Sequence, residues 1–306
     1  MIVVGDLHLK ETEPYWSAQK EFLNFLTDNF NDEIIVFLGD VFDSSSPQWE
    51  IYSVFKKYLL NKNAHTYIVQ GNHDFSKRKG SALEGLHLMN NVSIFFEEQD
   101  FSIVSLKCLA LPYKFGDLRE YENIKGDYDV VFSHITPNEC AFADEGLNLE
   151  KSIKSKYFIY GHTHTQKEWN SKDSTHIVVG VPLPTRNLEE PGCIYRIDSQ
   201  DCILRKIEIP TFFKIKNINY GDEIENKNWL YNIKNAPSYE SVYEKYKGFH
   251  IRNEGIEIEK NAFDFESNEN FVFETSNIRE KFLEYAKEKN LRKEVVDTSV
   301  SYLERL

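Results

Sequence analysis

Short runs of hydrophobic residues recur along the first two thirds of the chain, and amphipathic stretches lie between several of them. Apolar positions spaced three and four apart predict helices over Tyr15–Asn29, Gln48–Leu60 and Gly80–Asn90. The apolar runs predict strands over Ile2–Gly5, Glu33–Gly39, His65–Gln70, Val92–Glu97, Lys107–Leu111, Asp129–Ser133, Lys156–Tyr160, His176–Gly180, Gly192–Ile197 and Ile203–Ile209. Strands that alternate with helices and then continue without them indicate an α/β fold. We expect β-sheets layered as a sandwich and flanked by helices.

The composition of the sequence changes after Pro210. Residues 211–275 are polar, and they predict short strands with one helix over Ser238–Tyr246. We therefore expect a large domain over residues 1–210 and a small α+β domain over 211–275 that caps the large domain or contacts DNA. Residues 276–306 predict two consecutive helices. The apolar positions that share a face in these helices are Ile278, Phe282 and Leu283, then Val296, Val300 and Leu303.

Composition and charge limit the function classes. No apolar run approaches the ~18 residues of a membrane span, and the first residues lack the basic segment of a signal peptide. The four cysteines form no CxxC pair, so a zinc ribbon is not indicated. We expect a cytoplasmic protein that does not enter a membrane. The formal net charge of −13 argues against broad affinity for nucleic acid, so any DNA binding must be local.

Asp, Asn or His residues follow five of the predicted strands. The motifs are Asp6-Leu7-His8, Gly39-Asp40-Val41-Phe42-Asp43, Gly71-Asn72-His73-Asp74, Ser133-His134 and Gly161-His162-Thr163-His164. Ligands bind at the carboxyl ends of strands in open α/β sheets. Carboxylate, amide oxygen and imidazole suit Mn²⁺, Fe²⁺ or Zn²⁺. Asp6 and His8 lie two residues apart in an extended segment and can reach one ion, whereas His162 and His164 could serve two neighbouring ions.

One such motif alone is weak evidence, because a lone D-x-H or GNHD segment is often an ordinary turn. Their combination is stronger, since five of the nine histidines of the chain fall within these motifs. Histidines kept only for packing would not gather in this way. The sequence therefore predicts a divalent metal site.

In this order the motifs resemble those of the calcineurin-like metallophosphoesterases, over about residues 1–200. The resemblance implies the layered metallophosphoesterase sandwich and a binuclear metal site. It implies that one metal is held by Asp6, His8, Asp40 and His164, and that the other is held by Asp40, Asn72, His134 and His162. His73 would act on the scissile phosphate as a catalytic residue, and Asp43 would support it. The expected ions are Mn²⁺, with Mg²⁺ as the alternative, because imidazole-rich sites suit the softer ion.

Further motifs are similar to the SbcD and meiotic-recombination-eleven nuclease branch of that family. They are Asp-Leu-His-Leu at 6–9, Gly-Asp-Val-Phe-Asp-Ser-Ser-Ser-Pro at 39–47, Gly180-Val181-Pro182, Arg186, Glu189 and Glu190. This similarity implies an exonuclease on duplex ends and an endonuclease, within a DNA repair and recombination complex. It also implies a homodimer that binds an SbcC-type coiled-coil ATPase as a hetero-tetramer. The alternatives are a phosphoesterase for a small diester such as a cyclic nucleotide, and a non-catalytic scaffold.

Two segments allow more than one interpretation. Lys77, Arg78 and Lys79 directly follow the third motif, and they either contact DNA phosphates or form a solvated turn before a helix. The helices predicted over 276–306 either pack on their own domain or, by resemblance to the nuclease branch, dock on the ATPase. The many Phe, Tyr, Ile, Asn and Lys residues suggest an AT-rich genome, as in a phage. In that case the protein would act in the host cytoplasm.

Overall fold

The computed structural model describes residues 1–258 apart from 142–145, 185–191, 225, 227–228 and 253–254. The chain divides into two compact units, residues 1–259 and 260–306, and every described residue belongs to the first. The six apolar positions predicted between 278 and 303 therefore lie outside the described residues. Arg186, Glu189 and Glu190 lie outside them too.

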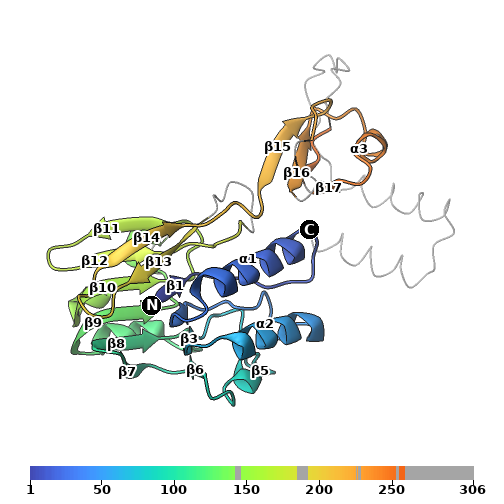
Figure 1. Cartoon of the computed structure of the whole chain (residues 1–306). Coiled ribbons are helices and arrows are strands. Elements are labelled where there is room, and N and C mark those ends of the chain that lie inside the picture. Colours follow the sequence, from blue (N-terminus) through green and yellow to red (C-terminus); the bar gives the residue numbers. More distant parts are fainter. Residues whose placement is uncertain (142–145, 185–191, 225, 227–228, 253–254, 259–306) are drawn as a thin grey trace, which may run out of the picture. The chain divides into compact units, whose positions relative to one another are not determined.

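Two six-stranded sheets form a sandwich (Figure 1). The order in the first sheet is β14 (Leu204–Glu208), β13 (Cys193–Ile197), β1 (Ile2–Val4), β2 (Ile35–Phe37), β3 (Thr66–Val69) and β6 (Val92–Phe95). The order in the second is β11 (Lys167–Asn170), β12 (Thr175–Val178), β10 (Ile153–Tyr160), β9 (Gly126–Ser133), β8 (Leu106–Leu111) and β7 (Gln99–Ile103). Strands β1, β2, β3 and β6 are parallel, as are β8, β9, β10 and β12. The predicted α/β sandwich is confirmed.

The central strands are buried on both faces, which explains their unbroken apolar sequence. Along β1, Val3 faces the second sheet and packs in the same core as Val130 of β9 and Ile159 of β10. Ile2 and Val4 face the opposite side and pack beneath the helices. A strand whose two faces both meet hydrophobic layers is held firmly, so its carboxyl end is a rigid support for a site.

Helices α1 (Tyr15–Phe30) and α2 (Trp49–Asn61) cover the outer face of the first sheet (Figure 1). Phe22 of α1 and Phe55 of α2 are buried in the core that these helices share with the sheet. Both helices agree with the sequence prediction to within one residue at each end. The outer face of the second sheet is covered by the 3₁₀ turns at Leu118–Asn123 and Leu149–Lys151, together with the loops around them.

The helix predicted over Gly80–Asn90 is wrong. The chain instead makes a hairpin of β4 (Phe75–Ser76) and β5 (Gly80–Ser81), followed by a 3₁₀ turn at Glu84–Leu86. Gly80 has a φ of +75°, which a helix does not allow. The apolar residues that suggested a helix are nevertheless buried, because the turn directs Leu83 and Leu86 into the core.

Residues 211–258 include a three-stranded sheet in the order β15 (Ile215–Asn219), β16 (Leu230–Lys234) and β17 (His250–Ile251). Helix α3 (Tyr239–Lys245) is capped by Ser238, whose hydroxyl accepts a hydrogen bond from the Ser241 amide. These elements enclose a small hydrophobic core of their own, which includes Tyr231 and Val242. Within the part of the chain that the structure describes, no helix is both long and apolar enough to cross a membrane.

Candidate metal centre

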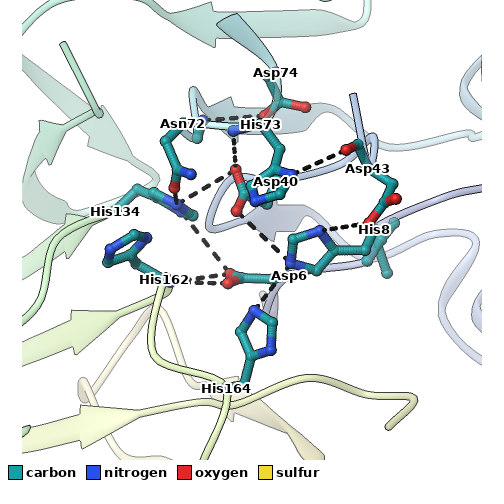
Figure 2. A network of polar contacts seen from close by, with 12 residues as sticks. Asp6, His8, Asp40, Asp43, Asn72, His73, Asp74, His134, His162 and His164 are labelled. Atoms are coloured by element: carbon teal, nitrogen blue, oxygen red, sulfur yellow. Dashed lines mark hydrogen bonds and ion pairs between the residues drawn. The ribbon is translucent and has the colours of Figure 1, made fainter. Parts of the chain in front are cut away.

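The five polar motifs meet at one edge of the sandwich (Figure 2). Three of them follow the parallel strands β1, β2 and β3 of the first sheet, and two follow the parallel strands β9 and β10 of the second. The carboxyl ends of both sheets therefore contribute to one site. The structure brings together all seven predicted metal ligands: Asp6, His8, Asp40, Asn72, His134, His162 and His164.

The backbone is unusual at three of these positions. His8, Asp40 and His162 have φ angles of +47°, +44° and +68°, in the left-handed region that residues other than glycine rarely adopt. Such conformations cost of order 1–3 kcal/mol each and concentrate at functional sites. The adjoining Gly161 has no room for a side chain, because a Cβ there would lie 2.7 Å from Asp6 Oδ1. The loops are thus shaped to aim these side chains inward at a cost in stability.

The donor atoms form three overlapping groups, each within 4.8 Å. They are Asp6, His8 and His164; His8, Asp40 and His73; and Asp40, His134 and His162. Asp40 belongs to two of the groups, since its Oδ2 is 3.7 Å from His8 Nε2 and its Oδ1 is 3.4 Å from His134 Nε2. A carboxylate shared in this way can serve two ions at once.

The short contacts between these side chains indicate that their metal-ligating atoms fit divalent cations. His134 Nδ1 lies 2.7 Å from the Leu38 carbonyl oxygen, which can only accept, so Nδ1 carries the proton. In neutral His134, Nε2 is then an acceptor, yet it lies 3.0 Å from the acceptor Oδ1 of Asn72. The Nε2 atoms of His8 and His164 also lie 3.0 Å apart. Each such pair needs a proton or a cation, and a divalent ion satisfies both partners.

Burial and charge shift the pKa values within the site. Burial raises the pKa of the Asp6 carboxyl. Burial also acts to raise that of Asp40, but the charges on His134 and His8 outweigh it and hold the Asp40 pKa well below its usual range. Burial opposes the charged form of His134, yet Asp40 and Asp6 raise its pKa to about 9. Burial and then the charge of His134 lower the pKa of His162 to about 4. The two carboxylates thus favour positive charge on His134, and His134 in turn disfavours a proton on His162.

His73 and Asp43, the two residues expected to act in catalysis, lie at the edge of the donor cluster. His73 Nδ1 lies 2.9 Å from the backbone oxygen of Asp43 and must donate to it, so Nε2 is left as the reactive nitrogen. Asp43 Oδ1 lies 3.4 Å from His8 Nδ1, longer than a good hydrogen bond but close enough for attraction. Asp43 thus lies where it can orient His8, one of the predicted metal ligands, and such partners are common around protein-bound metals.

Two supporting residues were missed from the sequence. Gln19 of α1 is buried and donates from Nε2 to the backbone oxygens of Leu7 and His8, at 3.2 and 2.7 Å. Asp74 is fully buried and accepts from the amides of Phe42 and Gly71, both at 3.0 Å, which joins the second and third motifs. Burial, followed by the charge of Asp40, raises the Asp74 pKa to about 6. A polar residue on the apolar face of a helix was the only sequence signal for Gln19.

The basic segment Lys77–Lys79 forms the exposed turn between β4 and β5, immediately after the third motif. It is therefore neither buried nor the start of a helix. The ammonium group of Lys77 lies 4.9 Å from the centre of the Phe115 ring, so one of the three cations has an aromatic neighbour.

The fold and the donor set define a class of protein, an α/β sandwich with a metal-binding edge. The sequence profile of the calcineurin-like phosphoesterases matches residues 1–166, more than half of the chain. The chain therefore belongs to the calcineurin-like phosphoesterase family, whose members hydrolyse phosphoesters with divalent metals.

Solved structures were also compared, and three similar ones follow. A novel archaeal phosphodiesterase is 20% identical, with a TM-score of 0.43 over 68% of this chain and 100% of that chain. Phosphopantetheinyl hydrolase from Mycobacterium tuberculosis is 14% identical, with a TM-score of 0.40 over 59% and 89%. Zinc-complexed Vps29 from Entamoeba histolytica is 13% identical, with a TM-score of 0.35 over 68% and 98%. No curated protein sequence matches the chain. The family assignment depends on the sequence profile alone.

Proposed function

We propose that this phosphoesterase is a two-metal phosphodiesterase that cleaves DNA, acting as the nuclease subunit of an SbcCD-like repair and recombination complex. The observation that carries the proposal is the seven-ligand cluster with His73 beside it. The choice of DNA is supported by the nuclease-like motifs at 6–9 and 39–47. It is also supported by three exposed cations, Lys77, Arg78 and Lys79, which follow the third motif and offer contacts to phosphates.

In this proposal one ion is held by Asp6, His8, Asp40 and His164, and a second by Asp40, Asn72, His134 and His162. Such ions supply Lewis acidity, which neutralises phosphate charge and activates water. Mn²⁺ is the ion we propose, because four of the seven proposed ligands are imidazoles, which suit it better than Mg²⁺. The protein holds the acids in place through backbone amides: His162 donates to Asp6 at 2.9 Å and His73 to Asp40 at 2.8 Å.

His73 supplies the protein's own acid–base group. Its Nδ1 proton is fixed on the Asp43 carbonyl, so Nε2 is the nitrogen that can carry a second proton or hydrogen-bond the substrate. The side chain is exposed, unlike those of Asp6 and Asp40, and can reach a bound phosphodiester. We propose that it donates a proton to the leaving oxygen or stabilises the charge on the phosphoryl group.

A small phosphodiester, such as a cyclic nucleotide, is the second candidate substrate. The observation that favours it is the formal net charge of −13, which repels a long polyanion more than a small one. The two candidates share the same metal centre and the same chemistry. They differ in whether the surface around the centre binds extended DNA.

Linear duplex DNA and bis-p-nitrophenyl phosphate, each with added Mn²⁺, separate these candidates. A DNA nuclease should cleave both, should lose both activities in EDTA, and should regain them better with Mn²⁺ than with Mg²⁺. Cleavage of the small ester alone would support the second candidate. Activity that persists at its full level in EDTA would contradict the two-metal proposal, and inactivity on both substrates would contradict a hydrolytic role.

We also propose that residues 276–306 bind an SbcC-type coiled-coil ATPase and that the chain acts as a homodimer. Support comes from the apolar stripe Ile278, Phe282 and Leu283, because an amphipathic pair of helices rarely folds without a surface to bury it. Truncation after Thr275 should leave metal-dependent cleavage of the small ester and abolish co-purification with the ATPase. If the truncated protein instead aggregates, these helices belong to the chain's own core.

A further inference from the structure

A cavity of about 830 Å³ opens beside the third motif, and its walls combine aromatic side chains with polar and charged ones. Phe75, Phe96, Phe115 and His87 line it, and the Phe75 and Phe115 rings lie 5.1 Å apart. Phe115 is 44% exposed, and the Lys77 ammonium lies 4.9 Å from the centre of its ring. The volume lies in the range of about 300–1,000 Å³ typical of small-ligand sites. None of these side chains belongs to the metal centre.

The cavity adjoins the metal centre through the backbone itself. Gln70 and Phe75 line it, and the chain between them is Gly71-Asn72-His73-Asp74. Phe75 is therefore two peptide units from His73, and Gln70 is two from Asn72, so each Cα pair is at most ~7.6 Å apart. The cavity therefore opens next to the third motif, and a ligand held by that motif has a short path to it.

The lining of the cavity carries more acids than cations, which disfavours a second phosphate there. Three acids, Glu84, Glu97 and Glu98, line it. The Lys77 ammonium lies 4.9 Å from the centre of the Phe115 ring, and the one cation in the lining itself is Lys114. That cation is already paired, 3.3 Å from Glu98 and 3.1 Å from Glu120. Carboxylates repel phosphate but accept hydrogen bonds from amino groups. The lining therefore suits an uncharged aromatic group that carries N–H donors.

Gln70 adds an acceptor of fixed orientation. Its Nε2 donates to the Tyr113 carbonyl oxygen at 3.1 Å, and this settles which end of the amide is which. The other end, Oε1, is buried and has no hydrogen-bond partner among the described residues. A buried acceptor without a partner costs about 1–3 kcal/mol. A ligand N–H that reached it would recover part of that cost.

We propose that this cavity binds an unpaired nucleobase next to the phosphodiester that is cleaved, and that it favours bases with an exocyclic amino group. The inference rests on the proposed function, since it takes the substrate to be a nucleotide diester. Aromatic walls provide stacking for any base, while the acidic rim and Gln70 accept from the amino groups of adenine and cytosine. Thymine offers one ring N–H but no exocyclic amino group and should bind more weakly.

Calorimetric titration of the Mn²⁺-loaded full chain with nucleosides tests the cavity directly, because nucleosides carry no phosphate. Adenosine and cytidine should bind at least about fivefold more tightly than thymidine, and ribose should not bind. Phe115→Ala should weaken adenosine binding about tenfold, within the range expected for one base–aromatic stack. Tyr239→Ala is the matched control, because it removes an aromatic ring that is 50% exposed and does not line the cavity. Ribose binding equal to adenosine, or equal loss in both variants, would overturn the proposal.

Cleavage of single-stranded oligonucleotides with one abasic position separates this inference from the proposed function. The wild-type enzyme should cleave next to an adenine about tenfold faster than next to an abasic site, and Phe115→Ala should reduce that ratio toward one. Equal cleavage beside base and abasic site would reject the base cavity and leave the nuclease proposal standing. Adenosine binding without cleavage of any diester would have the opposite meaning: the cavity would stand and the proposed function would fail.

Discussion

Asp40→Ala is expected to lower the kcat for bis-p-nitrophenyl phosphate by ~10³-fold or more and to remove most bound metal. Its carboxylate contacts the donor groups of both proposed ions, with Oδ2 3.7 Å from His8 and Oδ1 3.4 Å from His134. A metal ion contributes several kcal/mol of transition-state stabilisation, and each 1.36 kcal/mol is a factor of ten in rate. Elemental analysis of the purified variant, together with turnover in added Mn²⁺, measures both effects. Full occupancy by two ions in this variant would contradict the shared role of Asp40.

Asp43→Asn is the matched control, since it changes an acid of the same motif that touches only one side of the cluster. Asp43 Oδ1 lies 3.4 Å from His8 Nδ1. Loss of such an orienting partner typically costs ~10–100-fold in metal affinity or activity. The control variant should therefore bind one ion more weakly and recover much of its turnover at high Mn²⁺, whereas the Asp40 variant should not recover.

The positions of the predicted metal ligands at strand ends could be inferred because each depends on local sequence. An apolar strand buried on both faces, a glycine and then a polar side chain together place that side chain at a strand end, as at Gly39-Asp40 and Gly161-His162. Parallel strands bring these ends to the same edge. The two long helices could be predicted equally well from the sequence, since Phe22 and Phe55 lie on clear apolar faces.

What the sequence did not reveal depends on contacts between distant segments. The edge strands β7 and β11 are mostly exposed, so their sequences lack the apolar runs that predicted the central strands. Asp74 had been noted only as the end of a motif, yet its bonds to Phe42 and Gly71 join two loops. The apolar spacing of Leu83 and Leu86 suits a helix, but β-pairing of Ser81 with Phe75 directs the chain into a hairpin.

His73 differs from its neighbours in the cluster because a hydrogen bond outside the cluster fixes its ring. Nδ1 donates to the Asp43 carbonyl oxygen at 2.9 Å, and the ring meets that of His8 edge-on at 4.8 Å between centroids. Its contribution to Asp40 is made by the backbone amide, which any residue at this position retains. The imidazole can therefore be removed while the bond that orients Asp40 remains.

His73→Ala is expected to lower kcat by ~10²–10⁴-fold, the usual effect of removing a positioned acid–base group. Metal content should remain near that of the wild type, because the seven other donors and the amide bond to Asp40 are kept. DNA affinity should also change little, since the side chain acts on the transition state rather than on the bound ground state. His73→Gln is the informative second variant, since it restores a hydrogen-bond donor but not proton transfer. If Gln recovers the rate, the residue stabilises phosphoryl charge; if it does not, proton donation is the larger effect. Loss of an ion in either variant would show instead that His73 is a metal ligand.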